Sequence, residues 1–227
     1  MRKIPHVDVP PIYTVHEFID EELVEIPKDS GILVDMQYPH MGLKTAIDKF
    51  LVRKTFLEKL LEAKKNLPEG LTFKIWDAYR PLALQEELYY KYKADLIKTF
   101  KLENLSEDEQ NEIIRQYVSL PKADEEIPPL HATGAAIDLT LAHVEDGSCL
   151  DMGVGFDDFS NLSETDAFEA EGMDETVREN RRILYYAMVD AGFTNLPSEC
   201  WHFEYGDRNW GYYKNKPAIY KGIMKLD

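Results

Sequence analysis

The sequence predicts an α+β fold in which helices pack against a small, largely antiparallel sheet. Apolar and polar residues alternate in residues 71–75 and 137–141, as expected for strands with one buried face. Residues 45–65, 84–96 and 177–191 carry apolar side chains at helical spacing instead. The two kinds of stretch do not alternate regularly along the chain, which favours the α+β class over a parallel sheet with crossover helices.

Length and composition indicate one globular unit. The 227 residues are enough for one sizeable core, so we expect a single domain over residues 1–227. Hydrophobic residues make up 44% and charged residues 30%, as in ordinary globular proteins. The net charge of −16 argues against nucleic acid or an anionic membrane as a partner, because both attract basic surfaces.

The two cysteines and the first residues predict a cytoplasmic location. Cys149 and Cys200 are too few for a disulfide framework, so a reducing compartment is the simpler expectation. No apolar run follows Arg2 and Lys3, so we predict no signal peptide, and no stretch is long enough to span a bilayer.

The N-terminal part of the chain begins with prolines. We expect residues 1–31 to be irregular, although residues 17–25 are compatible with a short helix. Residues 32–38 then predict a strand that stops at Pro39. A helix over residues 45–65 follows.

The next strand leads directly into the stretch Asp77-Ala78-Tyr79-Arg80-Pro81, where Pro81 suits the first turn of a helix. Arg80 therefore stands where a strand passes to a helix, a common position for active-site residues. A guanidinium can donate two parallel hydrogen bonds to an oxyanion. From the residues alone, the alternative is a surface pair between Asp77 and Arg80 that holds the turn.

Residues 102–129 have the character of an insertion. A helix is expected over residues 102–119, because Ser106 and Glu109 have the spacing of a capping box. A loop rich in acidic residues and proline follows and leads to His131. Further on, Asp174 is in position to cap the helix over residues 177–191.

The stretch from His131 to Asp138 is the centre of the chain's chemistry. His131 and Asp138 lie seven positions apart, with Gly134 between them, and a second stretch places Glu199 three residues before His202. Two imidazoles and one carboxylate are a common ligand set for a catalytic zinc ion, which keeps a fourth position for water. A further carboxylate can take a proton from that water. Taken singly, each histidine could instead be a hydrogen-bonded residue at a strand end.

These stretches resemble the signatures of the D-alanyl-D-alanine dipeptidases, zinc peptidases of the VanX type among the D,D-carboxypeptidase-like metallopeptidases. The matching stretches are Asp77-Ala78-Tyr79-Arg80-Pro81, His131-x-x-Gly134-x-Ala136-x-Asp138 and Glu199-x-Trp201-His202. The resemblance extends over residues 32–213 and implies a D,D-carboxypeptidase/Hedgehog-like zinc peptidase fold. It also implies one zinc ion per chain, held by His131, Asp138 and His202, and hydrolysis of D-Ala-D-Ala or a similar short dipeptide.

The resemblance also assigns the catalytic roles. It implies that Arg80 stabilises the oxyanion of the transition state and that Glu199 is the general base. In a regular strand Glu199 and His202 would face opposite ways. From the pattern alone, two candidates for the general base are therefore nearly equal: Glu199, if it lies before the strand, and Glu204, which shares the face of His202.

Substrate contacts follow from the same resemblance. It implies that Tyr38, Asp77 and Asp157 bind the substrate, with Asp157 taking its ammonium group. Asp158 is the alternative to Asp157 for this role, because the sequence of a loop does not fix which of two adjacent residues faces the site.

Two departures from the family pattern concern the substrate. The family has serine shortly before its first ligand histidine, where this chain has Pro129 and Leu130, and an Asn-Phe pair of the family is replaced near Gly42. Two alternative functions therefore stay open at this point. One is a zinc D,D- or L,D-carboxypeptidase or endopeptidase acting on longer cell-wall peptides, and the other is a zinc-stabilised binding module without catalysis.

Overall fold

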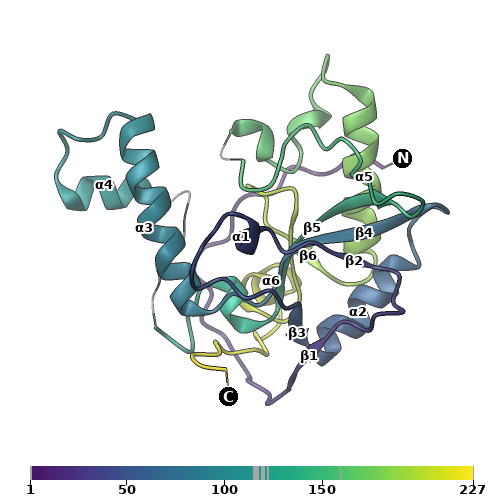
Figure 1. Cartoon of the computed structure of the whole chain (residues 1–227), viewed down its shortest axis with the longest axis horizontal. Helices are drawn as coiled ribbons and strands as arrows, with labels where there is room; N and C mark the ends of the chain where they lie inside the picture. The colour runs from purple at the N-terminus through teal and green to yellow at the C-terminus, as the bar shows by residue number, and fades with distance from the viewer. Residues whose placement is uncertain (1, 115–117, 119–120, 122, 159, 227) are drawn as a thin grey trace.

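The structure is a computed structural model that describes residues 2–114, 118, 121, 123–158 and 160–226. Its strands form a five-stranded sheet in the order β2-β4-β5-β7-β6 and a two-stranded sheet of β1 and β3 (Figure 1). The strands are β1 (Leu23–Glu25), β2 (Leu33–Val34), β3 (Leu51–Arg53), β4 (Leu71–Asp77), β5 (Ala136–His143), β6 (Thr194–Asn195) and β7 (His202–Glu204). The helices are α1 (Gln37–His40), α2 (Lys54–Lys64), α3 (Leu82–Thr99), α4 (Glu107–Ile114), α5 (Glu175–Val189) and α6 (Arg208–Lys214), with the 3-10 turns η1 (Leu130–Thr133), η2 (Asn161–Ser163) and η3 (Ala167–Glu169).

The sheets are largely antiparallel, which confirms the predicted fold class. β4 pairs with β5, β5 with β7 and β7 with β6 in antiparallel fashion, and the short edge strand β2 pairs with β4 in parallel. Helices α2 and α5 pack against each other and lie together beside the five-stranded sheet in Figure 1. The other helices are distributed around the remaining sides.

Strand β5 separates the hydrophobic core from the candidate site. Ile137, Leu139 and Leu141 are completely buried in the main core, which also contains Phe56 of α2 and Leu184 of α5. Because side chains alternate along a strand, Ala136, Asp138 and Thr140 point to the opposite face, where they are also buried. The strand thus carries a buried carboxylate on the face that the main core does not fill.

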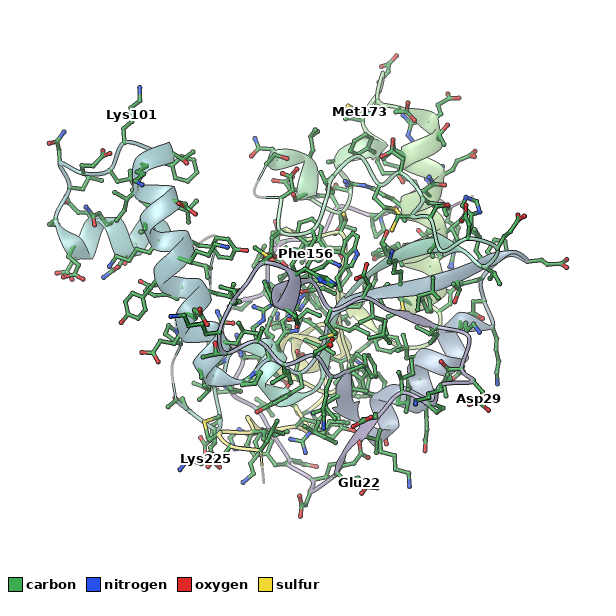
Figure 2. All side chains as sticks on the ribbon, in the orientation of Figure 1. Glu22, Asp29, Lys101, Phe156, Met173 and Lys225 are labelled. Atoms are coloured by element: carbon green, nitrogen blue, oxygen red, sulfur yellow. The ribbon has the colours of Figure 1, made fainter. Side chains whose placement is uncertain are left out.

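Helix α3 joins a second core to a projecting arm. One face of the helix contributes Leu84, Leu88 and Tyr92 to a separate apolar cluster that also contains Tyr38. Its far end extends away from the body of the molecule, and α4 folds back beside it (Figure 1). Lys101, between these helices, lies at the outer end of this arm, whereas Phe156 lies near the centre of the molecule (Figure 2). In the described part of the chain, no helix combines the length and apolarity needed to cross a membrane.

The arm contains the first part of residues 102–129, where an insertion was predicted. The capping box is confirmed, because the Ser106 amide and hydroxyl donate to Glu109 Oε2 over 2.9 and 2.6 Å, and the Glu109 amide faces Ser106 Oγ at 3.4 Å. Helix α4 covers only part of the predicted range and is described to Ile114. The rest of that prediction falls partly on residues 115–117, 119–120 and 122, which lie outside the described residues.

Two predictions for the N-terminal part were wrong. Residues 17–25 contain no helix but end in strand β1, and the predicted helix over residues 45–65 begins only at Lys54. The preceding residues form β3, which pairs antiparallel with β1. This pairing is made across the chain, so the local apolar spacing could not reveal it.

The strand predicted over residues 32–38 was also wrong in its second half. Only Leu33–Val34 pair with β4, and Gln37–His40 form the short helix α1. Pro39 occupies the third position of this helix, where a backbone N–H has no partner within the helix. Proline is therefore accepted there, although it would interrupt a central strand.

Candidate active site

Three neighbouring strands place three of the predicted site residues in a row. Asp138 of β5 is the cross-strand partner of His202 on β7 and of Asp77 on β4. The register of β4 shifts between Ile75 and Asp77. Ile75 pairs with the core residue Leu139, and regular alternation would leave Asp77 on the same face. The bulge turns Asp77 to the face of Asp138.

The turn η1 brings His131 to the same point. Gly134 follows the turn with a φ of +70°, a conformation that L side chains rarely adopt, and a Cβ there would collide with Leu23. The turn is fixed to its surroundings because the Arg80 amide donates to His131 O over 3.2 Å and the Arg53 amide to Gly134 O over 2.9 Å.

His131, Asp138 and His202 form one compact, buried group. His131 Nε2 lies 3.1 Å from His202 Nδ1 and 3.3 Å from Asp138 Oδ2, and Asp138 Oδ1 lies 3.0 Å from His202 Nδ1. Each residue offers one ligand atom to a set whose members all lie within 4.8 Å of one another. All three residues are at most 6% exposed.

The outer sides of the two imidazoles are occupied by acceptors. His131 Nδ1 donates to Ala78 O over 2.7 Å, and His202 Nε2 donates to Glu204 Oε1 over 3.1 Å. A neutral imidazole with one nitrogen protonated has its lone pair on the other. His131 Nε2 and His202 Nδ1 are therefore directed inwards as acceptors, the arrangement by which protein groups behind a histidine orient it toward a metal.

This donor set fits zinc. Bonds of 2.0–2.1 Å in a tetrahedron separate two ligand atoms by about 3.3 Å, close to the spacings in this group. The third donor is charged: burial alone would raise the pKa of Asp138, but when the facing imidazoles carry the protons that zinc would replace, they outweigh burial and hold the pKa well below its ordinary value. Two neutral imidazoles and one carboxylate suit a catalytic zinc ion, which takes three protein ligands.

Glu199 lies in a turn before β7 and not within the strand. The His202 amide donates to Glu199 O over 3.1 Å, which closes the turn, and Glu199 Oε2 comes within 3.9 Å of His202 Nδ1. The side chain is 34% exposed and lines the cleft beside the group of three. Burial raises the pKa of Glu199 to about 7.

Glu204 occupies the opposite side of His202. It is completely buried, accepts from His202 Nε2, and accepts a second hydrogen bond at Oε1 from Asn209 Nδ2 over 2.8 Å. Glu204 does not line the cleft that contains Glu199. The two carboxylates that were nearly equal candidates for the general base therefore lie on different edges of the His202 imidazole.

Arg80 is held in place by several partners. Its Nε and Nη2 both lie 2.8 Å from Asp77 Oδ2, and its Nη1 donates to Gln85 Oε1 over 3.0 Å. Nη2 also comes within 3.5 Å of Asp138 Oδ2, and the guanidinium carbon lies 4.8 Å from the centre of the Tyr38 ring. The Asp77–Arg80 pair is thus buried and not a surface pair. Arg80 and Tyr38 line the cleft, whereas Asp77 lies behind Arg80.

Asp157 is the second carboxylate of the cleft. Its Oδ2 accepts from Tyr38 Oη over 3.0 Å and from Tyr92 Oη over 2.5 Å. Burial raises its pKa to about 6. Its neighbour Asp158 also lines the cleft, but its Oδ1 accepts from the Ser160 amide of its own loop over 2.8 Å.

The cleft itself has a volume of about 350 Å³ and contains every predicted site residue except Asp77 and Asp138, which lie beneath its floor. The sequence did not identify Gln85, Tyr92 and Asn209, which hold Arg80, Asp157 and Glu204. Tyr92 was predicted as part of the apolar stripe of α3, and its ring does pack there. Its hydroxyl group, within an otherwise apolar stripe, was the signal in the sequence for this second contact.

Comparison with known proteins identifies related sequences. The family model described as D-ala-D-ala dipeptidase, peptidase family M15, matches residues 43–220. A D-alanyl-D-alanine dipeptidase of Synechocystis is 28% identical over 184 residues, which are 74% of this chain and 74% of that protein. One of Escherichia coli is 33% identical over 135 residues, covering 60% of this chain and 55% of the relative.

Solved structures provide one further comparison. The vancomycin-resistance D,D-pentapeptidase VanY, solved with Zn(II), is similar with a TM-score of 0.41 and 16% identity. The alignment covers 86% of this chain and 91% of that one.

Proposed function

Because the chain belongs to the D-Ala-D-Ala dipeptidase family, we propose that it hydrolyses D-Ala-D-Ala with Glu199 as general base and Arg80 as oxyanion stabiliser. The chain is a zinc metallopeptidase, and zinc is its cofactor. The observation that carries the proposal is that Glu199 and Arg80 line one cleft and both lie next to the His131, Asp138 and His202 group, Glu199 near His202 and Arg80 near Asp138.

The proposed zinc ligands are His131 Nε2, His202 Nδ1 and one oxygen of Asp138. A zinc ion at this position would lower the pKa of a bound water to about 7. Glu199 Oε2 lies on the cleft side of the group, where it can accept a proton from water and deliver it to the leaving amine. A carboxylate whose pKa is about 7 is suited to both steps near neutral pH.

Arg80 supplies positive charge to the carbonyl oxygen of the scissile bond. Its bonds to Asp77 and Gln85 fix the guanidinium before the substrate arrives, so little reorganisation is needed. One such contact is typically worth about 3–4 kcal/mol of barrier height. In this assignment Asp77 acts through Arg80 and does not touch the substrate itself, unlike the contact that the resemblance implied.

Asp157 is proposed to bind the ammonium group of the dipeptide, with Tyr38 and Tyr92 orienting its carboxylate. Both hydroxyls donate to Oδ2, which holds the carboxylate in one rotamer and leaves Oδ1 for the substrate. Asp158 is less suited to this role because it is bonded within its own loop.

The cytoplasmic location stays a prediction. It is supported by the cysteines, since Cys149 is exposed, Cys200 is buried and both are free thiols.

The proposed activity is tested by incubating the zinc-loaded protein with D-Ala-D-Ala, D-Ala-L-Ala, L-Ala-D-Ala and L-Ala-L-Ala and measuring the free alanine released. We expect preferential cleavage of D-Ala-D-Ala that a chelator abolishes and added zinc restores. Efficient release of D-Ala from a pentapeptide stem, with D-Ala-D-Ala left intact, would favour the carboxypeptidase alternative. Zinc binding without hydrolysis of any peptide would favour the binding module.

A further inference from the structure

The N-terminal segment passes across the active-site cleft. Four consecutive residues, Val9, Pro10, Pro11 and Ile12, line the same cleft as Arg80, Asp157 and Glu199. We refer to residues 9–12 as the N-terminal strap. The strap precedes residues 43–220, the span matched by the family model, so membership of the family does not assign it a role.

Hydrogen bonds and ring packing hold the strap on both sides. Just before it, Tyr213 Oη donates to Asp8 O over 2.9 Å, and further back the Ile4 amide donates to Glu169 over 2.9 Å. Just after it, the Tyr13 ring packs edge-on against Tyr212 with centroids 6.0 Å apart. Both tyrosine partners belong to α6, so the same helix secures the two ends of the strap.

The chain stays attached beyond these contacts. The Ala218 amide donates to Val15 O and the Glu17 amide donates to Ala218 O, each over 2.9 Å. These contacts anchor the segment on both sides of the strap. The strap is a fixed wall of the cleft.

The composition of the strap determines what this wall can offer to a substrate. Pro10 and Pro11 have no backbone N–H, and their φ angles are restricted. Two adjacent main-chain donors are therefore missing, which disfavours the addition of a peptide to this segment as a β-strand. What remains are the side chains of Val9 and Ile12, which are 59% and 71% exposed although they are apolar.

Other side chains that line the cleft are charged. Arg80, Asp157 and Glu199 provide the polar partners that the two ends and the peptide group of a dipeptide need. A dipeptide whose polar groups pair with these three side chains can place its own side chains against the apolar strap in the same cleft. Because the strap is held at both ends, it leaves a fixed space for those side chains.

We propose that the N-terminal strap is a specificity determinant, with Val9 and Ile12 restricting the cleft to dipeptides with small side chains. This inference rests on the proposed dipeptidase function and specifies its substrate class. In this proposal, residues that precede the catalytic signatures contact the substrate directly.

The experiment compares kcat/KM for D-Ala-D-Ala with kcat/KM for D-Ala-D-Phe and D-Phe-D-Ala. In the double variant Val9→Ala/Ile12→Ala, we expect the ratio of at least one bulky dipeptide to D-Ala-D-Ala to rise about tenfold or more, since a methylene-sized change in an apolar pocket changes discrimination by about tenfold or more. In Ile12→Trp the same ratio is expected to fall. Both positions are exposed, so neither change disturbs the core.

Val15→Ala is the matched control. Val15 belongs to the same segment and is 52% exposed, but it does not line the cleft. Its ratios should stay within about twofold of those of the unmodified protein. If the enzyme is active but the substrate ratios are unchanged in both cleft variants, or change equally in Val15→Ala, the strap is not a specificity determinant. The proposed dipeptidase function would still stand in that case. If the unmodified zinc-loaded protein cleaves no dipeptide, the proposed function fails and this inference fails with it.

Discussion

Asp138 Oδ1 and His202 Nδ1 lie 3.0 Å apart, and the two residues are direct cross-strand partners on β5 and β7. Their proximity is therefore set by strand register and not by the reach of flexible side chains. His131 joins them from η1, only a few residues before β5. A site built in this way is preorganised, because the backbone of the sheet and of η1 fixes the relative positions of the Cα and Cβ atoms of its members.

The first prediction concerns zinc content. His202→Ala and Asp138→Ala should each lose zinc, because two remaining donors cannot complete the three-ligand set. His143→Ala is the control, since His143 lies at the end of the same strand β5 but is exposed and outside the group. The measurement is zinc per chain after gel filtration. Full occupancy and activity in His202→Ala would refute the ligand assignment.

A second prediction separates the general base from the ligands. Glu199→Ala should keep its zinc and its fold but lose turnover by about 100-fold or more, since proton transfer by a positioned side chain contributes roughly 10²–10⁴-fold. Zinc analysis and initial rates on D-Ala-D-Ala, made on the same preparation, provide the check. If Glu204→Ala instead shows normal zinc affinity with abolished turnover, the base has been assigned to the wrong edge of His202.

Glu204 leads to a third prediction with a different signature. Its Oε1 accepts from His202 Nε2 and from Asn209 Nδ2, so it acts behind the ligand and not in the cleft. Glu204→Gln and Asn209→Ala should weaken zinc binding by about 10–100-fold, the usual effect of losing a group that orients a metal-binding histidine. Competition with a chromogenic chelator measures this affinity. An unaltered zinc affinity in both variants would show that Glu204 does not orient His202 for the metal.

Much of this arrangement was predictable because it depends on local pattern. The alternation in β4 and β5 and the caps of α4 and α5 require only neighbouring residues, and the Asp174 side chain does accept from the Val177 amide over 3.0 Å. That Glu199 leaves the strand was one of two open interpretations, since Pro197 and Ser198 precede it. The structure places the start of β7 at His202.

Other parts depend on contacts that no local pattern records. The bulge at Trp76 turns Asp77 toward the site, and it is visible only in the pairing of β4 with β5. The same holds for β3, which exists because β1 lies beside it. The catalytic roles came from resemblance to a family, not from spacing. They stay predictions until variants of Glu199 and Arg80 are measured.

The fourth prediction concerns pH. Burial raises the pKa of Asp157 to about 6; Tyr38 and Tyr92 donate to it, Arg80 favours its charge and Asp138 opposes it. Only the ionised carboxylate binds an ammonium group, so affinity for D-Ala-D-Ala should be full above pH 6 and fall about tenfold per unit below it. Calorimetry on zinc-loaded Glu199→Ala between pH 5 and 7.5 measures this without turnover. When Asp157→Asn is added to this variant, D-Ala-D-Ala should bind weakly at every pH. The same dependence of affinity on pH as in Glu199→Ala alone would contradict the assignment.

The last prediction concerns selection for a free amino terminus. A dipeptide has little apolar surface, so most of its recognition must come from its charged ends, and a carboxylate facing an ammonium group is the strongest pair available. Asp157 is held in one orientation by Tyr38 and Tyr92. An N-acetylated dipeptide presents a neutral amide there and leaves a desolvated carboxylate without its partner.

That loss costs roughly 1–3 kcal/mol or more, which is a bias of at least about fivefold against the acetylated substrate. N-acetyl-D-Ala-D-Ala should therefore show a strongly reduced kcat/KM, and Asp157→Ala should narrow the difference between free and acetylated forms because the unpaired charge is gone. Asp158→Ala is the matched control, since its carboxylate lines the same cleft but is bonded to Ser160, and it should leave the difference intact. Efficient cleavage of the acetylated dipeptide by the unmodified protein would exclude Asp157 as the ammonium site. A carboxylate that binds the ammonium group must lose affinity when the amino terminus is made neutral.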